Sequence, residues 1–211
     1  MEAVAHRILI AGIGPGHPDY ILPAARQAIS SAKVLVGGRR ALEGLAHDGQ
    51  KQMPITKDIA SVIGFIREEL ASEDVVVMVS GDPGYYSMLD ALRKEFPREQ
   101  LQVIPGISSL QMAFAKLALP WHGARLLSFH GRQPEERELF YEKGAVLGML
   151  TDGTFDSHRI PRLLMEKGWP KETWLAVCAR LSYEDERIVE TTLEGALEME
   201  EIKHGILIVQ G

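Results

Sequence analysis

The chain of 211 residues carries 23 Lys and Arg against 29 Asp and Glu, and 45% of its residues are apolar. This balance is ordinary for a globular protein. The net charge of -6 argues against a broad nucleic-acid surface, which needs clustered basic residues. The single cysteine, Cys178 in the apolar run TWLAVCARL, excludes an intrachain disulfide and a cysteine-based metal site, and it is expected in the core.

Targeting signals are not evident in the sequence. No stretch approaches the roughly 20 apolar residues of a membrane span. The opening MEAVAHRILIAG lacks the basic start and the long apolar body of a signal peptide. We therefore expect a cytoplasmic protein without a membrane partner.

Short apolar runs alternate with amphipathic stretches along the whole chain. The runs are rich in Val, Ile and Leu and are closed by turn residues, which predicts buried strands. In chain order they are RILIAG, AKVLVGG, DVVVMVSG, LQVIPG, ARLLSFHG, AVLGMLTD, WLAVCARL and GILIVQG. The stretches with helical spacing are PAARQAISSA, DIASVIGFIREELAS, GYYSMLDALRKEF, SSLQMAFAKLAL and DSHRIPRLLMEKG. This alternation predicts an α/β fold.

A domain boundary is expected in LALPWHG, residues 117–123. A helix must end before Pro120, and Gly123 follows closely. The sequence therefore predicts two α/β domains, residues 1–119 and 120–211.

The first expected strand ends in the glycine-rich turn GIGPGHPD, residues 12–19. A dinucleotide fingerprint needs glycines at its first, third and sixth positions and an acid after the second strand. The sixth position here is His17, and the second strand closes as VLVGGRR without an acid. Prolines also delay the helix to about Pro23. NAD binding is therefore disfavoured, and a simple turn and a loop for another ligand both remain open.

Two further loops of similar composition follow the third and fourth expected strands. These are SGDP, residues 80–83, and PGISS, residues 105–109. Each has an ordinary structural explanation, because Asp82 can bond its own turn and the two serines can cap a helix. In a parallel sheet, however, all three loops meet at the carboxyl edge, where ligands bind in open α/β sheets. Together they indicate a binding site.

The stretches GIGPGHPD, SGDPGYYS, PGISSLQMA, SFHGR and TDGTF, in this order and spacing, resemble the tetrapyrrole methylases. These enzymes use S-adenosylmethionine to methylate carbons of porphyrin and corrin precursors. The resemblance extends from about residue 7 to the last expected strand. Within the family, VLVGGRRALEGL, PGISSLQMAFAKLALPW and SFHGR are most similar to enzymes that methylate carbon 5 of cobalt-precorrin-7 in cobalamin biosynthesis.

The resemblance implies a fold of two αβα domains, that of the class III S-adenosylmethionine-dependent methyltransferases, with the methyl donor held between them. S-adenosylmethionine offers an ammonium, a carboxylate, ribose hydroxyls and an adenine, so its site needs close backbone, hydroxyls and an acid. Carried over by position, the donor contacts are Pro15, Ser80, Gly81, Asp82, Tyr85, Ser108, Ser109, Leu150 and Thr151. Asp82 is the expected acid.

The acceptor implied is a reduced tetrapyrrole whose meso carbon is nucleophilic enough to attack without a strong base. Its rim of acetates and propionates suits a guanidinium, so Arg132 in SFHGR is the expected clamp. An ion pair of Arg132 with Glu135 or Glu136 is the competing explanation. His130 is a weak candidate for a base and a second acceptor contact, since a lone histidine after a strand is more often structural. No metal ligand set is expected.

The resemblance also implies a homodimer and a functional pairing with a separate decarboxylase that methylates carbon 15. The loops for the donor do not identify the acceptor, so methylation of another tetrapyrrole carbon or of a modified protein side chain remains an alternative. A nucleotide-binding module without catalysis is the alternative from another functional class.

Overall fold

The computed structural model describes residues 6–211, which divide into one unit ending at Ser108 and a second from Ser109 to Gly211. Each unit contains one five-stranded sheet. Residues 1–5, part of the stretch on which the expected lack of a signal peptide rests, lie outside the described residues. Among residues 6–211, no helix is both long and apolar enough to cross a bilayer.

The first unit alternates strands and helices. Its elements are β1 (Ile8–Gly12), η1 (Pro18–Tyr20), α1 (Pro23–Ser31), β2 (Val34–Gly37), α2 (Arg39–Leu45), β3 (Lys51–Pro54), α3 (Ile59–Glu69), β4 (Val75–Val79), α4 (Leu89–Glu95), η2 (Arg98–Gln100) and β5 (Leu101–Ile104). The helix predicted to start near Pro23 does begin there, because proline is favoured in the first turn.

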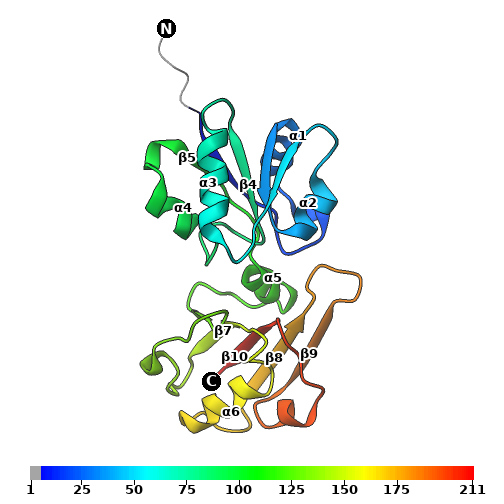
Figure 1. The fold of residues 1–211 in the computed structure, drawn as a ribbon. Helices are drawn as coiled ribbons and strands as arrows, with labels where there is room; N and C mark the ends of the chain where they lie inside the picture. Colours follow the sequence, from blue (N-terminus) through cyan, green and yellow to red (C-terminus); the bar gives the residue numbers. More distant parts are fainter. Residues whose placement is uncertain (1–5) are drawn as a thin grey trace. The chain divides into compact units, whose positions relative to one another are not determined.

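All strand pairs of the first sheet are parallel, in the order β3-β2-β4-β1-β5. Alternate residues of β4 point to opposite faces: Val75 and Val77 pack with residues of α3 and α4, whereas Val76 and Met78 pack with residues of α1 and α2. The helices accordingly cover both faces of the sheet (Figure 1). Burial on both faces explains the continuous apolar run of the strand.

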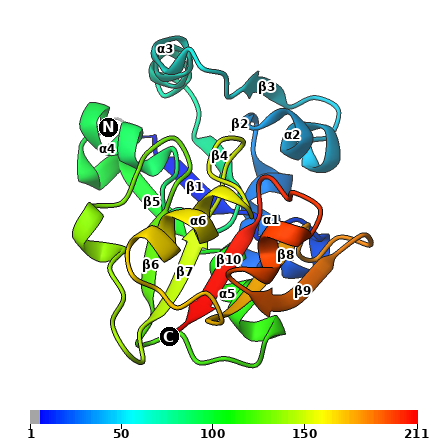
Figure 2. The same cartoon turned by 90° about the horizontal axis from the view of Figure 1, so that it is seen from below.

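The second unit has fewer helices. Its elements are α5 (Ser109–Lys116), β6 (Arg125–Ser128), η3 (Glu136–Glu138), β7 (Val146–Leu150), α6 (Arg159–Glu166), β8 (Trp174–Ala179), β9 (Arg187–Thr192), η4 (Gly195–Glu198) and β10 (Ile206–Gln210). Its sheet is mixed. β6 and β7 are parallel, while β10 lies antiparallel between β7 and β8. Figure 2 shows the strands side by side in the order β6-β7-β10-β8-β9.

Helix α5 belongs to the second unit, although the sequence placed the boundary after residue 119. Its side chains Leu110 and Phe114 pack against Gly148 of β7, where a Cβ would stand 2.9 Å from the Phe114 ring. The glycine thus admits a large side chain against the sheet. This packing ties the helix to the elements that follow it rather than to those before it.

An ion pair anchors the end of α5 to the loop before β9. Lys116 Nζ lies 2.8 Å from a carboxylate oxygen of Glu186, with side chains 35% and 21% exposed. Glu186 also accepts a bond from the Ser182 amide at 2.7 Å. The bond from Lys116, together with that from Ser182, holds the pKa of Glu186 below its ordinary value, against the opposing effect of burial.

Replacing Glu186 with Gln should therefore lower the melting temperature at pH 7 by ~1–4 °C, since a partly exposed pair contributes little. A carboxyl whose pKa is depressed by folding stabilises above its unfolded pKa, and this stabilisation is lost as the pH falls through the folded-state pKa. The gap between the two proteins should close on acidification from pH 7 to pH ~3. Glu184→Gln is the control, because it removes an exposed carboxylate of the same loop and leaves the Lys116–Glu186 pair in place. An equal gap at pH 7 and pH ~3 between Glu186→Gln and the unsubstituted protein would contradict the assignment.

Candidate active site

The loops after β1, β4 and β5 meet at the carboxyl edge of the first sheet, as the sequence predicts for a parallel arrangement. Gly14 and Gly81 form an isolated bridge across this edge. The Gly81 amide donates to Gly14 O at 2.8 Å, and the Gly14 amide donates to Gly81 O at 3.3 Å. Strands β1 and β4 pair in parallel, whereas this bridge is antiparallel, so it links the two loops separately from the strand ladder.

Glycine is required here because backbone approaches backbone. A Cβ on Gly12 would lie 2.7 Å from Gly106 N and 2.8 Å from Gly81 O. A Cβ on Gly106 would overlap Gly81 O and approach Gly12 Cα to 2.9 Å. These glycines therefore serve contact between the three loops themselves. Their spacing needs no dinucleotide to explain it.

Asp82 ties two of the loops together. One carboxylate oxygen accepts from the Gly84 amide at 2.8 Å, which closes its own turn. The other accepts from the Gly106 amide at 3.0 Å, in the loop after β5. The sequence predicted the turn at Asp82 but not the hydrogen bond from the Gly106 amide. A direct contact of Asp82 with the methyl donor stays a prediction. Both oxygens of the Asp82 carboxylate already accept hydrogen bonds from backbone amides.

The surface around these loops offers the groups that S-adenosylmethionine requires. Ser80 is exposed, and Pro15, Tyr85, Ser108 and Ser109 are partly exposed. Hydroxyls and accessible backbone suit ribose, ammonium and carboxylate groups. Gly81 lies in the left-handed region at φ +69°, and its would-be Cβ is 3.4 Å from Ser108 Cα. The residues present therefore fit the donor chemically.

The remaining predicted residues belong to the second unit. His130 and Arg132 are exposed in the loop that follows β6, at its carboxyl end as expected. Leu150 ends β7, and Thr151 follows it as a buried residue. The Thr151 hydroxyl accepts from the Gly205 amide at 2.6 Å and donates to Gly205 O at 3.1 Å. Its hydroxyl therefore links β7 to β10.

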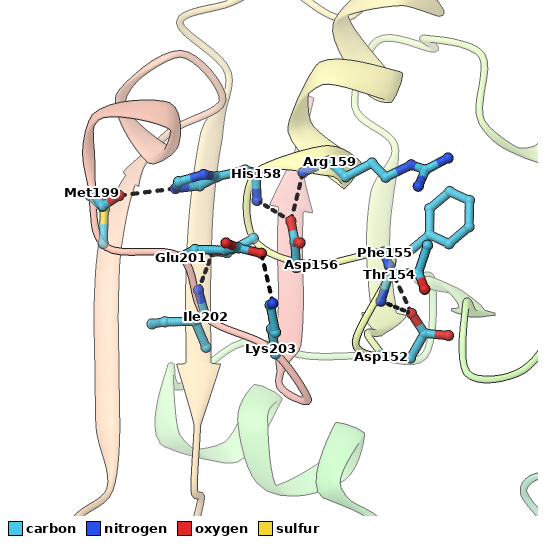
Figure 3. A network of polar contacts seen from close by, with 11 residues as sticks. Asp152, Thr154, Phe155, Asp156, His158, Arg159, Met199, Glu201, Ile202 and Lys203 are labelled. Atoms are coloured by element: carbon cyan, nitrogen blue, oxygen red, sulfur yellow. Dashed lines mark hydrogen bonds and ion pairs between the residues drawn. The ribbon is translucent and has the colours of Figure 1, made fainter.

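Two aspartates in this part of the second unit were not singled out by sequence reasoning (Figure 3). Asp152 accepts from the amides of Thr154 and Phe155, both at 2.7 Å. Asp156 accepts from the amides of His158 at 2.9 Å and Arg159 at 2.8 Å, at the start of α6. An aspartate two residues before the amide it binds is the signal that could have revealed both.

The pKa directions agree with these contacts. The Phe155 and Thr154 amides hold the pKa of Asp152 below its ordinary value, with smaller contributions in the same direction from the Gly131 amide and from the interaction with His130. Burial alone would raise the pKa of Asp156, but the bond from Arg159, with others, outweighs it and lowers the pKa. Both groups are ionised near neutral pH. Among residues 6–211, no cluster of three or more His, Cys, Asp or Glu could hold a metal ion.

A model of the tetrapyrrole (corrin/porphyrin) methylases matches residues 7–197. The chain belongs to this family. It is an S-adenosylmethionine-dependent methyltransferase. The predicted family, α/β fold class, methyl donor and enzymatic nature are thus confirmed, and the alternative of a module without catalysis is set aside.

The alignments with three curated relatives each cover 86% of this chain. It is 30% identical over 194 residues to the probable cobalt-precorrin-7 C(5)-methyltransferase of Methanocaldococcus jannaschii, covering 86% of this chain and 87% of that protein. It is 30% identical over 181 residues to the cobalt-precorrin-7 C(5)-methyltransferase of Salmonella typhimurium, covering 86% and 88%. The decarboxylating precorrin-6Y C(5,15)-methyltransferase of Sinorhizobium sp is 25% identical over 188 residues, 86% of this chain but 44% of that protein.

Solved structures agree with the fold. The cobalamin biosynthesis precorrin-6Y methylase from Archaeoglobus fulgidus superimposes with a TM-score of 0.72 at 26% identity, over 97% of each chain. Uroporphyrin-III C-methyltransferase from Thermus thermophilus, solved with S-adenosylhomocysteine, gives a TM-score of 0.76 at 24% identity, over 96% of this chain and 91% of that one.

The contact between loops can be tested with one added methyl group. Gly106→Ala should destabilise the protein by about 1–3 kcal/mol, because the Cβ has no room, and should weaken S-adenosylhomocysteine binding at least ~10-fold by separating the loops. Gly64→Ala on α3, where nothing lies within 4 Å of the new atom, is the matched control and should stabilise by roughly 0.5–1 kcal/mol. Denaturant unfolding and calorimetry measure both, and normal donor binding by Gly106→Ala would contradict the proposed role of the glycine.

Proposed function

We propose that this methylase transfers a methyl group to carbon 5 of cobalt-precorrin-7 in cobalamin biosynthesis. The observation that carries the proposal is the 30% identity, over 86% of the chain, to two enzymes of that name from distant organisms. Incubation with S-adenosylmethionine and individual cobalt-precorrins, followed by mass and NMR analysis of the product, tests it. Methylation of a different ring carbon would overturn the assignment to carbon 5 while leaving the family untouched.

The donor is proposed to bind on the loops at the carboxyl edge of the first sheet. Backbone groups of Pro15 and Gly81 and the hydroxyls of Ser80, Ser108 and Ser109 would hold its polar groups, with Tyr85 against an apolar part. Asp82 would act mainly by keeping these loops together. Leu150 and Thr151 are proposed as further donor contacts, Thr151 through its backbone or methyl group because its hydroxyl already bonds Gly205.

The acceptor is proposed to bind beside the loop after β6. The carboxylates on its rim meet a protein of net charge -6, so local cations must offset the overall repulsion. Arg132 can hold a carboxylate through two parallel bonds, and His130 adds a donor next to it. Both side chains are exposed at the sheet edge, which leaves them accessible to a large ligand.

S-adenosylmethionine, when bound, supplies a methyl group activated by a sulfonium. The protein's main task is then to align this methyl with the nucleophilic ring carbon and to exclude water. Positioning of two reactants can lower a barrier by ~7–11 kcal/mol, so no strong base is needed. In this mechanism His130 orients the acceptor or accepts a proton afterwards.

We further propose a homodimer and a functional pairing with a decarboxylase that methylates carbon 15. The pairing is supported by the Sinorhizobium relative, which is named for both carbons and for decarboxylation, and of which this chain covers 44%. On this proposal, the C15 methylation and the decarboxylation belong to the part of that relative beyond the match. Light scattering of the purified protein measures the oligomeric state.

The choice of cofactor gives a direct prediction. S-adenosylhomocysteine should bind with 1:1 stoichiometry per chain, whereas NAD should not bind, since the turn lacks the sixth-position glycine and the ribose acid. Isothermal calorimetry with each ligand makes the comparison. Preference for NAD would remove the basis of the proposed donor site.

The acceptor clamp gives a second prediction. Arg132→Ala should raise the Michaelis constant for the cobalt-precorrin about tenfold to a hundredfold, as expected for loss of a charge-assisted contact of ~1.5–3 kcal/mol. The dissociation constant of S-adenosylhomocysteine should stay within error. Arg137→Ala is the matched control, because Arg137 is in the same segment, pairs with Glu135 at 2.7 Å and is 82% exposed. Equal effects of the two substitutions would indicate a general charge effect and not a clamp.

A further inference from the structure

Asp152 contacts two segments of the second unit. One of its oxygens accepts from the amides of Thr154 and Phe155 in its own turn. Its other oxygen accepts from the Gly131 amide at 3.4 Å, in the loop after β6. Gly131 stands between His130 and Arg132, the two residues proposed to meet the acceptor. A single carboxylate therefore touches the centre of that loop.

The loop leaves the sheet at a well-anchored point. The Phe129 amide donates to Leu150 O at 2.9 Å, which continues the pairing of β6 with β7. The buried Phe129 ring stacks on Phe155, with ring centroids 5.0 Å apart. Beyond it, Gly131 adopts φ +67°, and nothing lies within 4 Å of the position of a Cβ. The chain direction after Phe129 thus depends on backbone contacts such as that with Asp152.

We propose that Asp152 is a positioning residue for the acceptor, which sets the direction of His130 and Arg132 by holding the Gly131 amide. The proposal rests on the function proposed above. It assigns to Asp152 no contact with the tetrapyrrole and no proton transfer. Its effect reaches the acceptor only through the loop.

An acid near a site for a polycarboxylate would ordinarily repel the ligand. Here backbone N–H groups face both carboxylate oxygens, and the nearby His130 adds a favourable interaction, so much of the charge is compensated locally. The first unit contains the same arrangement of an aspartate between two loops. Asp82 binds its own turn at Gly84 with one oxygen and another loop at Gly106 with the other. An aspartate after a central strand thus links two loops in each unit.

Asp152→Asn changes this link with little change in shape. The amide oxygen can keep the two bonds within the turn, and the amide nitrogen then faces the Gly131 N–H, so two donors oppose each other. We expect the dissociation constant for uroporphyrin III, a tetrapyrrole polycarboxylate, to rise ~3–10-fold in a fluorescence titration without methyl donor. The dissociation constant of S-adenosylhomocysteine should be unchanged, and the melting temperature should stay within ~2 °C. With the cobalt-precorrin, the Michaelis constant should rise while kcat is nearly kept.

Asp82→Asn is the matched control, since it makes the same change facing the Gly106 amide. It should weaken S-adenosylhomocysteine binding and leave uroporphyrin III binding unchanged. A double-mutant cycle with Arg132→Ala tests the route of the effect: if Asp152 acts through the loop, its substitution should weaken uroporphyrin III binding less than 2-fold in the Arg132→Ala background.

Three results would overturn the positioning role: unchanged uroporphyrin III binding by Asp152→Asn, full additivity with Arg132→Ala, or a loss of more than ~5 °C in melting temperature, which would mark Asp152 as a structural residue. Failure of the proposed function looks different. In that case the unsubstituted protein would bind S-adenosylhomocysteine but neither bind uroporphyrin III nor methylate any cobalt-precorrin, and the positioning role would fail with it.

Discussion

Direct backbone contact between the loops after β1, β4 and β5 is the constraint on which the carboxyl edge of the first sheet depends. Gly12, Gly81 and Gly106 approach one another so closely that a Cβ on Gly12 or on Gly106 would collide with backbone of the neighbouring loops. Glycine at these positions lowers helix or strand propensity locally, yet it permits a surface made largely of backbone. Such a surface presents peptide groups without the conformational entropy of long side chains.

The apolar strands follow from local sequence, the edge strands β5 and β6 included, whereas the other two edge strands do not. Strands such as β4 consist of continuous apolar residues because helices cover both faces of the parallel sheet. The edge strands β3, with the sequence KQMP, and β9, with RIVETT, are partly exposed and carry no such run, so the sequence did not predict them. Helix α2 is short and follows a pair of glycines, and it was missed for the same lack of periodicity.

The contacts between these loops were likewise predictable only in part. Loop composition and order predicted that the three loops meet at the carboxyl edge of the sheet, and the turn at Asp82 followed from its own sequence. Its bond to Gly106 could not be foreseen, because β4 and β5 are separated by β1 and their loops meet only through the strand order. The link between Asp152 and Gly131 likewise depends on the pairing of β6 with β7. Contacts between loops therefore require the topology, which no local pattern contains.

The position of β10 has a consequence for how the chain acquires its structure during synthesis. The last strand of the sequence lies between β7 and β8, so the sheet of the second unit exists only as the separate pairs β6–β7 and β8–β9 until β10 arrives. The first sheet uses residues up to Ile104 and can form while later residues are still being added. A ribosome that stalls before Ile206 would thus hold a chain with one finished sheet and one split sheet, whose unpaired inner edges are open to wrong partners.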